Sequence, residues 1–396
     1  MVKSLIIQIG GGQLSEGMFD EINNKMYQGQ YDAWVLMSSA FNKNKVEDKE
    51  ILYFPDFIFI SHEHGEDVLY LKERFVELHK KYPNLENIRV IYTKGTSALK
   101  KGQDYFNVIY NPAIATITAL CETFPSTITK TLVMASSSAV SIPGMTQRSK
   151  YAEVRGKTDE KVLALCEKYQ IRGAIARLDL VFNKLKPHSR NTNHGCSYAN
   201  MSRMILHPFF GNEEQGRTIL AIQPISIEHW TAFALSQRVG FDAKMSIVNA
   251  VGNKTYTSYE AYLLELRPRN KKLRPLYLPL SLTRTLMPYL WRTPGISQSI
   301  LGGEFLDVRS RNPQANQALD FEDFYKYFDS LRTVEEYKSQ EMDPIAAPSP
   351  LKNLLTAVVL AFFHHPLPIV SVIPGILIQV LKQLPQLILG KSSSKE

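Results

Sequence analysis

Cysteine is scarce in this chain, with three among its 396 residues. Cys121, Cys166 and Cys196 lie far apart in the sequence, are odd in number and form no paired metal-ligand spacing. This pattern argues against a disulfide framework and against a structural zinc site. It favours a reducing compartment, so we expect an intracellular protein on the cytoplasmic side.

The sequence also lacks a signal peptide and internal repeats. The N-terminal apolar run Leu5–Ile9 ends at glycines rather than at a cleavage site, and it has the length of a buried strand. No segment repeats at a fixed period, and no long stretch is of low complexity. These absences argue against a secreted protein and against a repeat architecture.

Positive charge is plentiful but is not concentrated. The formal net charge of +8 and the isoelectric point near 9.1 would suit contact with anionic lipid or nucleic acid. However, Lys and Arg are spread along the chain, without a basic block interleaved with aromatic residues. We therefore interpret the charge as a solvated basic surface and find no clear nucleic-acid site.

Short apolar runs alternate regularly with helical patterns. Hydrophobic residues make up 44% and charged residues 21% of the chain, which allows a substantial core. The alternation is typical of crossover units, and it predicts an α/β fold with a doubly wound, Rossmann-like parallel sheet and helices on both faces. The expected strands are Leu5–Ile9, Ala33–Met37, Phe57–Ile60, Ile88–Tyr92, Thr131–Ala135 and Gly173–Arg177, and the clearest expected helices are Asn111–Phe124 and Tyr151–Tyr169.

Changes in composition divide the chain into three parts. Residues 1–182 are expected to form the Rossmann-like nucleotide-binding core. Residues 183–345 carry shorter strand-like pieces, such as Thr218–Ile222 and Met245–Asn249, and are expected to form a smaller cap or substrate region that completes the same domain. Residues 346–396 form an apolar tail that begins with a linker-like Pro-containing segment.

The tail has an unusual composition, with no Asp, Glu, Lys or Arg between Lys352 and Lys382. Its apolar runs Leu354–Phe363 and Ile369–Val380 are interrupted by prolines, whereas a membrane span needs about 20 uninterrupted apolar residues. We expect residues 351–389 to contact a membrane or lipid peripherally, with lysines facing the headgroups. The alternative is a pair of helices packed over an apolar groove of this protein or of a partner.

A glycine-rich turn, Gly10-Gly11-Gly12, follows the first strand and opens a helical pattern. Glycines at such a turn let the backbone approach a pyrophosphate, whose charge then faces the amides of the helix N-terminus. Gly10 and Gly12 fit the dinucleotide-binding spacing, Ser15 stands where a third glycine is expected, and Gly17 follows two residues later. Gly10, Gly12 and Gly17 are therefore candidate cofactor-binding residues, and a simple tight turn is the alternative.

The end of the second strand bears on which cofactor would bind. An acidic residue at this point would bind a ribose hydroxyl of NAD, and an arginine would suit the 2′-phosphate of NADP. The strand ends instead in Ser38-Ser39, with Lys43 and Lys45 just beyond. Ser38 is a further candidate cofactor-binding residue, and the expected cofactor is NADP or NAD, with the case for NAD weakened.

A second constellation could carry acid–base chemistry. Ser138 is the last of three serines that close the strand around Leu132–Ala135, and Tyr151, Arg155 and Asp159 follow within one helical pattern. Spacing of four places these three side chains on one helix face. A phenol beside a fixed cation can exchange a proton with a carbonyl or alcohol, and a nearby serine can orient the substrate oxygen. Ser138, Tyr151 and Arg155 are therefore the candidate catalytic residues.

Together these features resemble the extended and atypical short-chain dehydrogenases/reductases. The segment Arg172–Phe182 resembles the strand that leads into the substrate region of that family, and Gln223–Trp230 resembles the segment that returns to the cofactor side. Val248–Gly252, followed by Thr257–Glu260, is similar to a later strand and helix. The resemblance covers roughly residues 3 to 340.

The resemblance implies a role for each matched residue. Ser138 would orient the substrate, Tyr151 would be the general acid/base, and the glycines would hold the phosphates of NAD or NADP. Arg155 departs from the family, which has a lysine at this position, because arginine is bulkier, forked and always protonated. Lys157 would point elsewhere on the helix.

Two functions follow from this resemblance. The first is an NAD(P)-dependent oxidoreductase that acts on a hydroxyl or carbonyl group of a hydrophobic substrate. The second is a catalytically inactive scaffold or regulatory protein, which the Arg155 departure favours.

The segment Ser61–Asp67 suggests a minor third function. Its two histidines, one residue apart, and its acidic pair resemble the metal-binding turn of metallo-β-lactamase-like hydrolases. The match is out of register, because Glu66 stands where that pattern has aspartate and Asp67 where it has histidine. A metal-dependent hydrolase is therefore only a minor alternative, and we expect no metal.

Overall fold

The computed structural model describes the N-terminal half of the chain most completely. The described residues are 2–11, 14, 15, 18, 31–38, 56–60, 64–95, 103–141, 145–179, 181–182, 206–210, 221–222, 225–236, 239, 244–250, 256–257 and 274–278.

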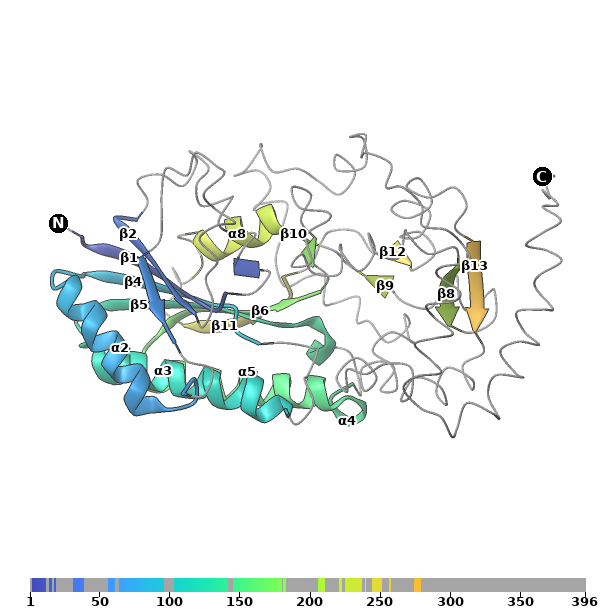
Figure 1. Cartoon of the computed structure of the whole chain (residues 1–396), viewed down its shortest axis with the longest axis horizontal. Helices are drawn as coiled ribbons and strands as arrows, with labels where there is room; N and C mark the ends of the chain where they lie inside the picture. Colours follow the sequence, from blue (N-terminus) through green and yellow to red (C-terminus); the bar gives the residue numbers. More distant parts are fainter. Residues whose placement is uncertain are drawn as a thin grey trace.

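A seven-stranded parallel sheet forms the centre of the described structure (Figure 1). The strand order is β11-β6-β5-β4-β1-β2-β3, and every neighbouring pair is parallel. This arrangement confirms the predicted Rossmann-like, doubly wound α/β fold. The strands are β1 (Ser4–Ile9), β2 (Ala33–Ser38), β3 (Asp56–Phe59), β4 (Asn87–Tyr92), β5 (Thr129–Ser137), β6 (Arg172–Leu178) and β11 (Met245–Val248).

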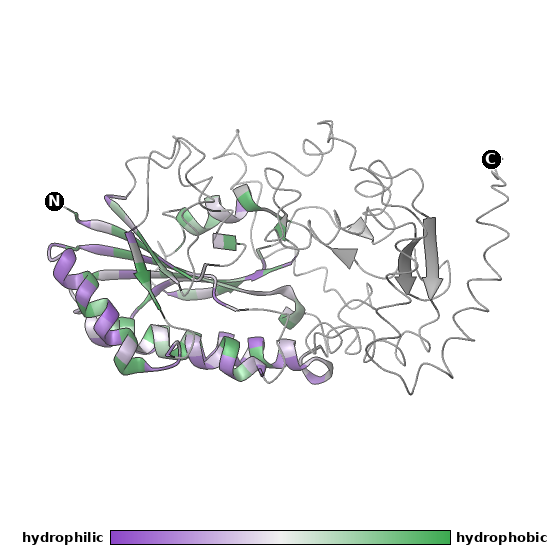
Figure 2. Cartoon of the chain, in the orientation of Figure 1, coloured by the Kyte–Doolittle hydropathy of each residue, from purple (hydrophilic) through white to green (hydrophobic). Residues whose placement is uncertain are grey.

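Helices cover both faces of the sheet. Helices α2 (Val68–Lys81), α3 (Asn111–Thr123) and α5 (Lys150–Lys168) lie along one face, and α8 (Ile227–Leu235) lies on the other (Figure 1). Hydrophilic and hydrophobic stretches alternate along α2, α3 and α5, as expected for helices with one face in the core (Figure 2). The central strands are buried between these layers, which explains their nearly continuous apolar sequences.

Three short helical segments lie near the ends of the strands. A π-helical segment, η3 (Phe106–Tyr110), leads directly into α3. A 3-10 turn, η4 (Ser138–Ser141), and the short helix α4 (Met145–Arg148) connect β5 to α5. These segments bring the predicted catalytic residues close to the carboxyl edge of the sheet.

Helix α5 has a well-defined start that sets the position of Tyr151. The side chain of Ser149 caps the helix by accepting a hydrogen bond of 3.3 Å from the backbone N–H of Ala152. Glu153 lies in the first turn, where a negative charge faces the positive end of the helix dipole. The buried face of α5 includes the two charged residues Arg155 and Asp159 beside apolar ones.

The region after residue 182 contributes both to the sheet and to smaller pairings. Strand β11, which belongs by sequence to the expected cap region, is an edge strand of the main sheet and pairs with β6. Three short pairings are described beyond the main sheet. They join β7 (Val181–Phe182) to β10 (Ile225–Ser226), β8 (Leu206–Phe210) to β13 (Arg274–Leu278), and β9 (Ala221–Ile222) to β12 (Tyr256–Thr257).

The predicted membrane-contacting segment, residues 351–389, lies outside the described residues. Within the described ranges, no helix is long and apolar enough to cross a bilayer.

We predict that a buried histidine makes the fold sensitive to acid. His229 on α8 is 6% exposed, and burial lowers the pKa of its imidazole from 6.5 to about 4. The imidazole therefore binds a proton more readily in the unfolded chain than in the folded one. The contribution of His229 to the free energy of unfolding is fully present above about pH 6.5 and is lost as the pH falls towards 4. Between about pH 7 and pH 5, we expect the free energy of unfolding to fall by about 2 kcal/mol through this residue.

Urea denaturation of the wild type and of His229→Gln at both pH values measures this contribution. The variant should lose less stability than the wild type over the same pH interval. Equal losses would show that His229 does not carry the effect.

Candidate functional site

The candidate site lies where the direction of the sheet reverses. Strands β1 and β4 are hydrogen-bonded neighbours at its centre, while the chain runs from β1 to β2 on one side and from β4 to β5 on the other. The connections after β1 and β4 therefore leave the sheet in opposite directions. In an open parallel sheet, this arrangement leaves a crevice for a ligand at the carboxyl ends of the strands.

Gly10 makes the turn at the carboxyl end of β1. Its φ of 109° is a backbone conformation that favours glycine, and its N–H donates a 3.0 Å hydrogen bond to the carbonyl of Met37. A Cβ atom at Gly10 would lie 2.9 Å from the backbone nitrogen of Lys94, at the end of β4. The ends of β1 and β4 are therefore too close to accommodate a side chain at this position.

Ser15 stands where the dinucleotide-binding pattern has its third glycine, and its contacts explain how it fits. The side chain is buried, and its hydroxyl donates to the carbonyl oxygen of Gly10. The same hydroxyl lies 2.7 Å from Oγ1 of Thr93, which in turn donates to the carbonyl of Ile9. Ser15 thus joins the helical turn to the ends of both central strands.

The remaining predicted cofactor-binding residues are only partly described. Gly12 and Gly17 lie outside the described residues. Ser38 is the buried last residue of β2, and its carbonyl accepts a 3.0 Å hydrogen bond from the N–H of Ile60. Ser38 therefore lies at the same edge of the sheet as Gly10, one strand away.

The end of β4 supplies residues that the sequence analysis did not identify. Gly95 is exposed and has a φ of 143°, a conformation that favours glycine. A Cβ atom at Gly95 would lie 2.6 Å from Nη2 of Arg155. Lys94 is half-buried, and burial lowers the pKa of its ammonium group against the opposing charge of Glu66. A glycine three residues after a buried strand was the sequence signal that could have revealed this segment.

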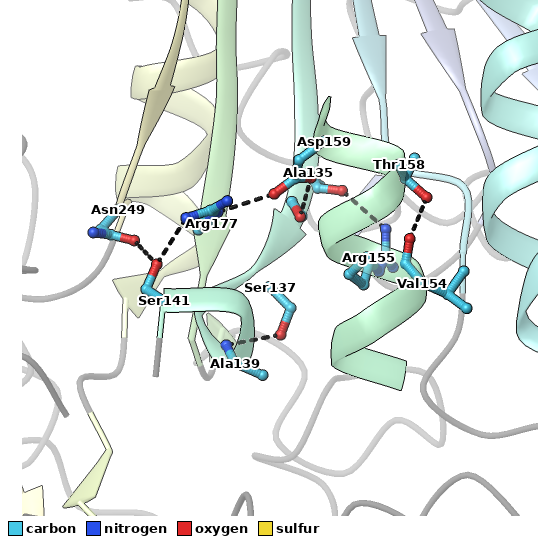
Figure 3. A network of polar contacts seen from close by, with 11 residues as sticks. Ala135, Ser137, Ala139, Ser141, Val154, Arg155, Thr158, Asp159, Arg177 and Asn249 are labelled. Atoms are coloured by element: carbon cyan, nitrogen blue, oxygen red, sulfur yellow. Dashed lines mark hydrogen bonds and ion pairs between the residues drawn. The ribbon is translucent and has the colours of Figure 1, made fainter. Parts of the chain in front are cut away.

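Arg155 reaches from α5 to the ends of β4 and β5. Arg155 is 7% exposed, and its Nη1 donates a 3.2 Å hydrogen bond to the carbonyl of Ala135 (Figure 3). The guanidinium carbon lies 5.5 Å from the centre of the Tyr151 ring, which is cation–π distance. Lys157 is exposed and pairs with Glu153 at 2.6 Å, so it points away from the site as predicted.

Tyr151 is half-buried beside a second aromatic ring. Its ring packs edge-on against Tyr105, with the two centroids 5.4 Å apart. Among the described residues, none forms a hydrogen bond with its hydroxyl. The phenol is therefore held by ring packing and retains its capacity to donate and accept a hydrogen bond.

Ser138 lies close to the start of α5 because η4 packs against that helix. The residue after Ser138, Ala139, is buried against Ala152, the residue after Tyr151. Farther along the same helix, a Cβ atom at Gly156 would lie 3.5 Å from a methyl group of Val140, so the two segments pack closely. The structure thus brings Ser138, Tyr151 and Arg155 to one edge of the sheet.

A buried polar network lies beside these residues and fixes α5 against the sheet (Figure 3). Asp159 is completely buried, accepts a 2.6 Å hydrogen bond from Ser136 and forms a 2.9 Å ion pair with Arg177. Arg177 also donates to Ser141, whose hydroxyl is 2.6 Å from the Asn249 side chain. Burial raises the pKa of the Asp159 carboxyl, while hydrogen bonds from Ser136 and Arg177 and the charges of Arg177 and Arg155 oppose the shift.

The sequence placed Asp159 on the face of Tyr151 and Arg155, but it did not identify the partners of Asp159. Arg177 carried the only local signal, as a charged residue within an otherwise apolar strand pattern. The network connects α5, β6, η4 and the end of β11, which are remote from one another in the sequence.

The histidine-containing segment before α2 has a structural role in its described part. Asp67 caps α2 by accepting hydrogen bonds from the N–H groups of Leu69 and Tyr70. Glu66 accepts a 2.8 Å hydrogen bond from Asn111. In the part of the chain that the structure describes, no group of three or more His, Cys, Asp and Glu side chains could hold a metal ion.

Comparisons with solved structures identify the fold. A dTDP-glucose 4,6-dehydratase from Streptomyces venezuelae, solved with NAD bound, superposes with a TM-score of 0.51 at 12% identity, covering 81% of this chain and 98% of the other. The two chains share a Rossmann-like fold built on a parallel sheet. The protein Pal from Bacillus thuringiensis superposes on this chain with a TM-score of 0.52 at 10% identity, covering 82% of this chain and 99% of the other.

The likeness lies in the fold rather than in the sequence. No protein-family model matches the sequence, and no curated protein is similar enough to count as a match. At the level of the fold, this superposition confirms the resemblance to short-chain dehydrogenases/reductases on which the sequence predictions were based.

We predict that the Asp159–Arg177 pair is strongly coupled. Asp159→Asn leaves the Arg177 guanidinium without its counter-charge in a largely buried position, which should cost about 3 kcal/mol of unfolding free energy. The double variant Asp159→Asn/Arg177→Met should lose clearly less unfolding free energy than the single variants Asp159→Asn and Arg177→Met added together. Urea denaturation of all four proteins measures the coupling, and simple additivity would contradict it.

Proposed function

We propose that this chain binds NAD or NADP at the crevice between β1 and β4 and acts as an oxidoreductase on a hydroxyl or carbonyl group. One observation carries the proposal. Glycines stand at Gly10, directly after β1, and at Gly95, shortly after β4. Gly10 lies against Lys94, and Gly95 lies against Arg155 of α5, whose guanidinium stacks on Tyr151. Glycines at the point where the strand order of a parallel sheet reverses allow the backbone to approach a dinucleotide closely.

The charges around the crevice suit the same ligand. Lys94 and Arg155 contribute positive charge near the two glycines, and a dinucleotide carries a pyrophosphate. The Ser15 hydroxyl is already bonded to Gly10, so it stabilises the turn. The Streptomyces dehydratase of similar fold was solved with NAD, which supports the proposed cofactor.

The residues at the end of β5 would supply the proton chemistry. Tyr151 would donate a proton to the substrate oxygen or accept one from it, and Ser138 would hold that oxygen in place. Arg155 would stabilise negative charge on the phenol, because it remains protonated and packs over the ring. The bound nicotinamide would supply or accept the hydride.

A non-catalytic nucleotide-binding protein is the second candidate, and Arg155 is the observation that favours it. One nitrogen of the guanidinium is bonded to the Ala135 carbonyl, and the group is buried. A forked, permanently charged side chain cannot deliver and recover protons as a lysine can. The fold alone does not decide between the two candidates.

The substrate class and location rest on the sequence. The apolar segment 351–389 suggests peripheral membrane contact on the cytoplasmic side and a hydrophobic substrate.

Titration of the purified protein with NADH and NADPH, followed by fluorescence and thermal unfolding, tests the proposed cofactor. A nucleotide at about 100-fold above its Kd should add about 2.7 kcal/mol of stability. Gly10→Ala should weaken binding at least tenfold, because its Cβ would meet the Lys94 backbone. The matched control is Gly156→Ala, whose Cβ would be in ordinary contact with Val140 and should leave binding unchanged.

The absence of NADH and NADPH binding to a folded wild-type protein would contradict the proposal. If a nucleotide binds, its oxidation in the presence of a panel of aldehydes and ketones separates the two candidates. Turnover that Tyr151→Phe abolishes without changing the nucleotide Kd supports the oxidoreductase, and binding without turnover supports the second candidate.

A further inference from the structure

The Arg155 guanidinium is a buried charge that lacks an anionic partner in the described structure. Within the described residues, no carboxylate lies within 4.0 Å of the guanidinium, although the side chain is only 7% exposed. Its protein hydrogen bond is from Nη1 to the Ala135 carbonyl, and the buried Nε has no partner. An uncompensated buried charge is unfavourable by several kcal/mol, so such groups normally face a counter-ion.

The acidic residues on the same helix are already engaged. Asp159 directs one carboxylate oxygen to Ser136 and the other to Arg177. Glu153 pairs at the surface with Lys150 and Lys157. Asp159 therefore acts on Arg155 through its charge and not through a direct ion pair, and Glu153 pairs with other cations.

A second buried polar group, near Arg155, also has no hydrogen-bond partner among the described residues. The Tyr92 hydroxyl, at the end of β4, is buried without a hydrogen-bond partner, and burial raises its pKa although the Arg155 charge opposes the shift. The phenol is therefore neutral and cannot act as the counter-charge.

One edge of the guanidinium lies against a glycine. Nη2 lies 2.6 Å from the position that a Cβ atom of residue 95 would occupy, and Gly95 is itself exposed. Residue 95 places no side chain against this edge of the guanidinium, while the Tyr151 ring and the Ala135 carbonyl hold the group in place. A planar guanidinium whose N–H groups are not all hydrogen-bonded can bind two oxygens of one anion.

We propose that Arg155 anchors an anionic oxygen group, a phosphate or a carboxylate, of a ligand that enters over Gly95 at the ends of β4 and β5. The inference rests on the proposed function, because it assumes that the crevice is a ligand site. The anionic group belongs either to the dinucleotide itself or to the second substrate. In the latter case, the substrate carries a phosphate or carboxylate near its reacting hydroxyl or carbonyl.

Inorganic pyrophosphate and malonate are suitable probes, with binding followed by calorimetry and thermal unfolding at fixed ionic strength. Arg155→Met removes the charge and keeps a similar apolar stem, and should weaken binding of a probe at least tenfold. Lys157→Met, an exposed lysine on the same helix, is the matched control and should leave binding unchanged. If Arg155→Met does not fold, Arg155→Lys replaces it and should weaken binding at least threefold, because lysine lacks the fork.

Repeating the titrations with saturating NADPH distinguishes the two sources of the anion. Displacement of the probe by NADPH assigns the anion to the dinucleotide, and probe binding to the NADPH-loaded protein assigns it to the substrate. Equal probe affinities of the wild type and the folded Arg155 variants, or no probe binding at all, would overturn the proposal. Arg155-dependent probe binding without any NADH or NADPH binding would support this anion site while the proposed cofactor failed.

Discussion

Parallel pairing between β1 and β4 at the centre of the sheet determines where the other parts of the described structure can lie. Since both strands point the same way, Gly10 and Gly95 emerge at one edge, and the chain leaves them towards opposite sides. The closeness of the two strand ends excludes a side chain at Gly10 and places the Ser15 hydroxyl between them. The candidate site follows from this geometry rather than from any single motif.

The position of α5 depends on buried charge. Asp159 and Arg177 lie in an otherwise apolar layer, so their carboxylate and guanidinium must pair, and the pair defines how α5 sits on β5 and β6. Arg155, one turn earlier, lies on the same face but lacks such a partner within the described residues. The same helix thus carries one charge that is paired within the protein and another that has no ion-pair partner among the described residues.

Much of the sheet could be predicted from local patterns. The apolar runs marked all seven strands of the main sheet to within a few residues, although Met245–Asn249 was assigned to the cap region. The four-residue spacing placed Tyr151, Arg155 and Asp159 on one helix, and the first two are in contact. The contacts of Ser15, Gly95 and Arg177 were not predictable in this way. Each involves groups from strands or helices that are far apart in the sequence, and local spacing carries no information about such pairs.

The sequence by itself determined the class of fold and the helix face that carries the candidate chemistry, because hydrophobic periodicity and side-chain spacing are local properties of strands and helices. Tertiary structure alone decided that β11 completes the main sheet, that the carboxyl ends of β1 and β4 meet, and that Arg155 is buried beside Gly95. These outcomes depend on strand pairing and helix packing across long sequence separations. Only the folded chain brings those backbone and side-chain groups within hydrogen-bonding or van der Waals distance.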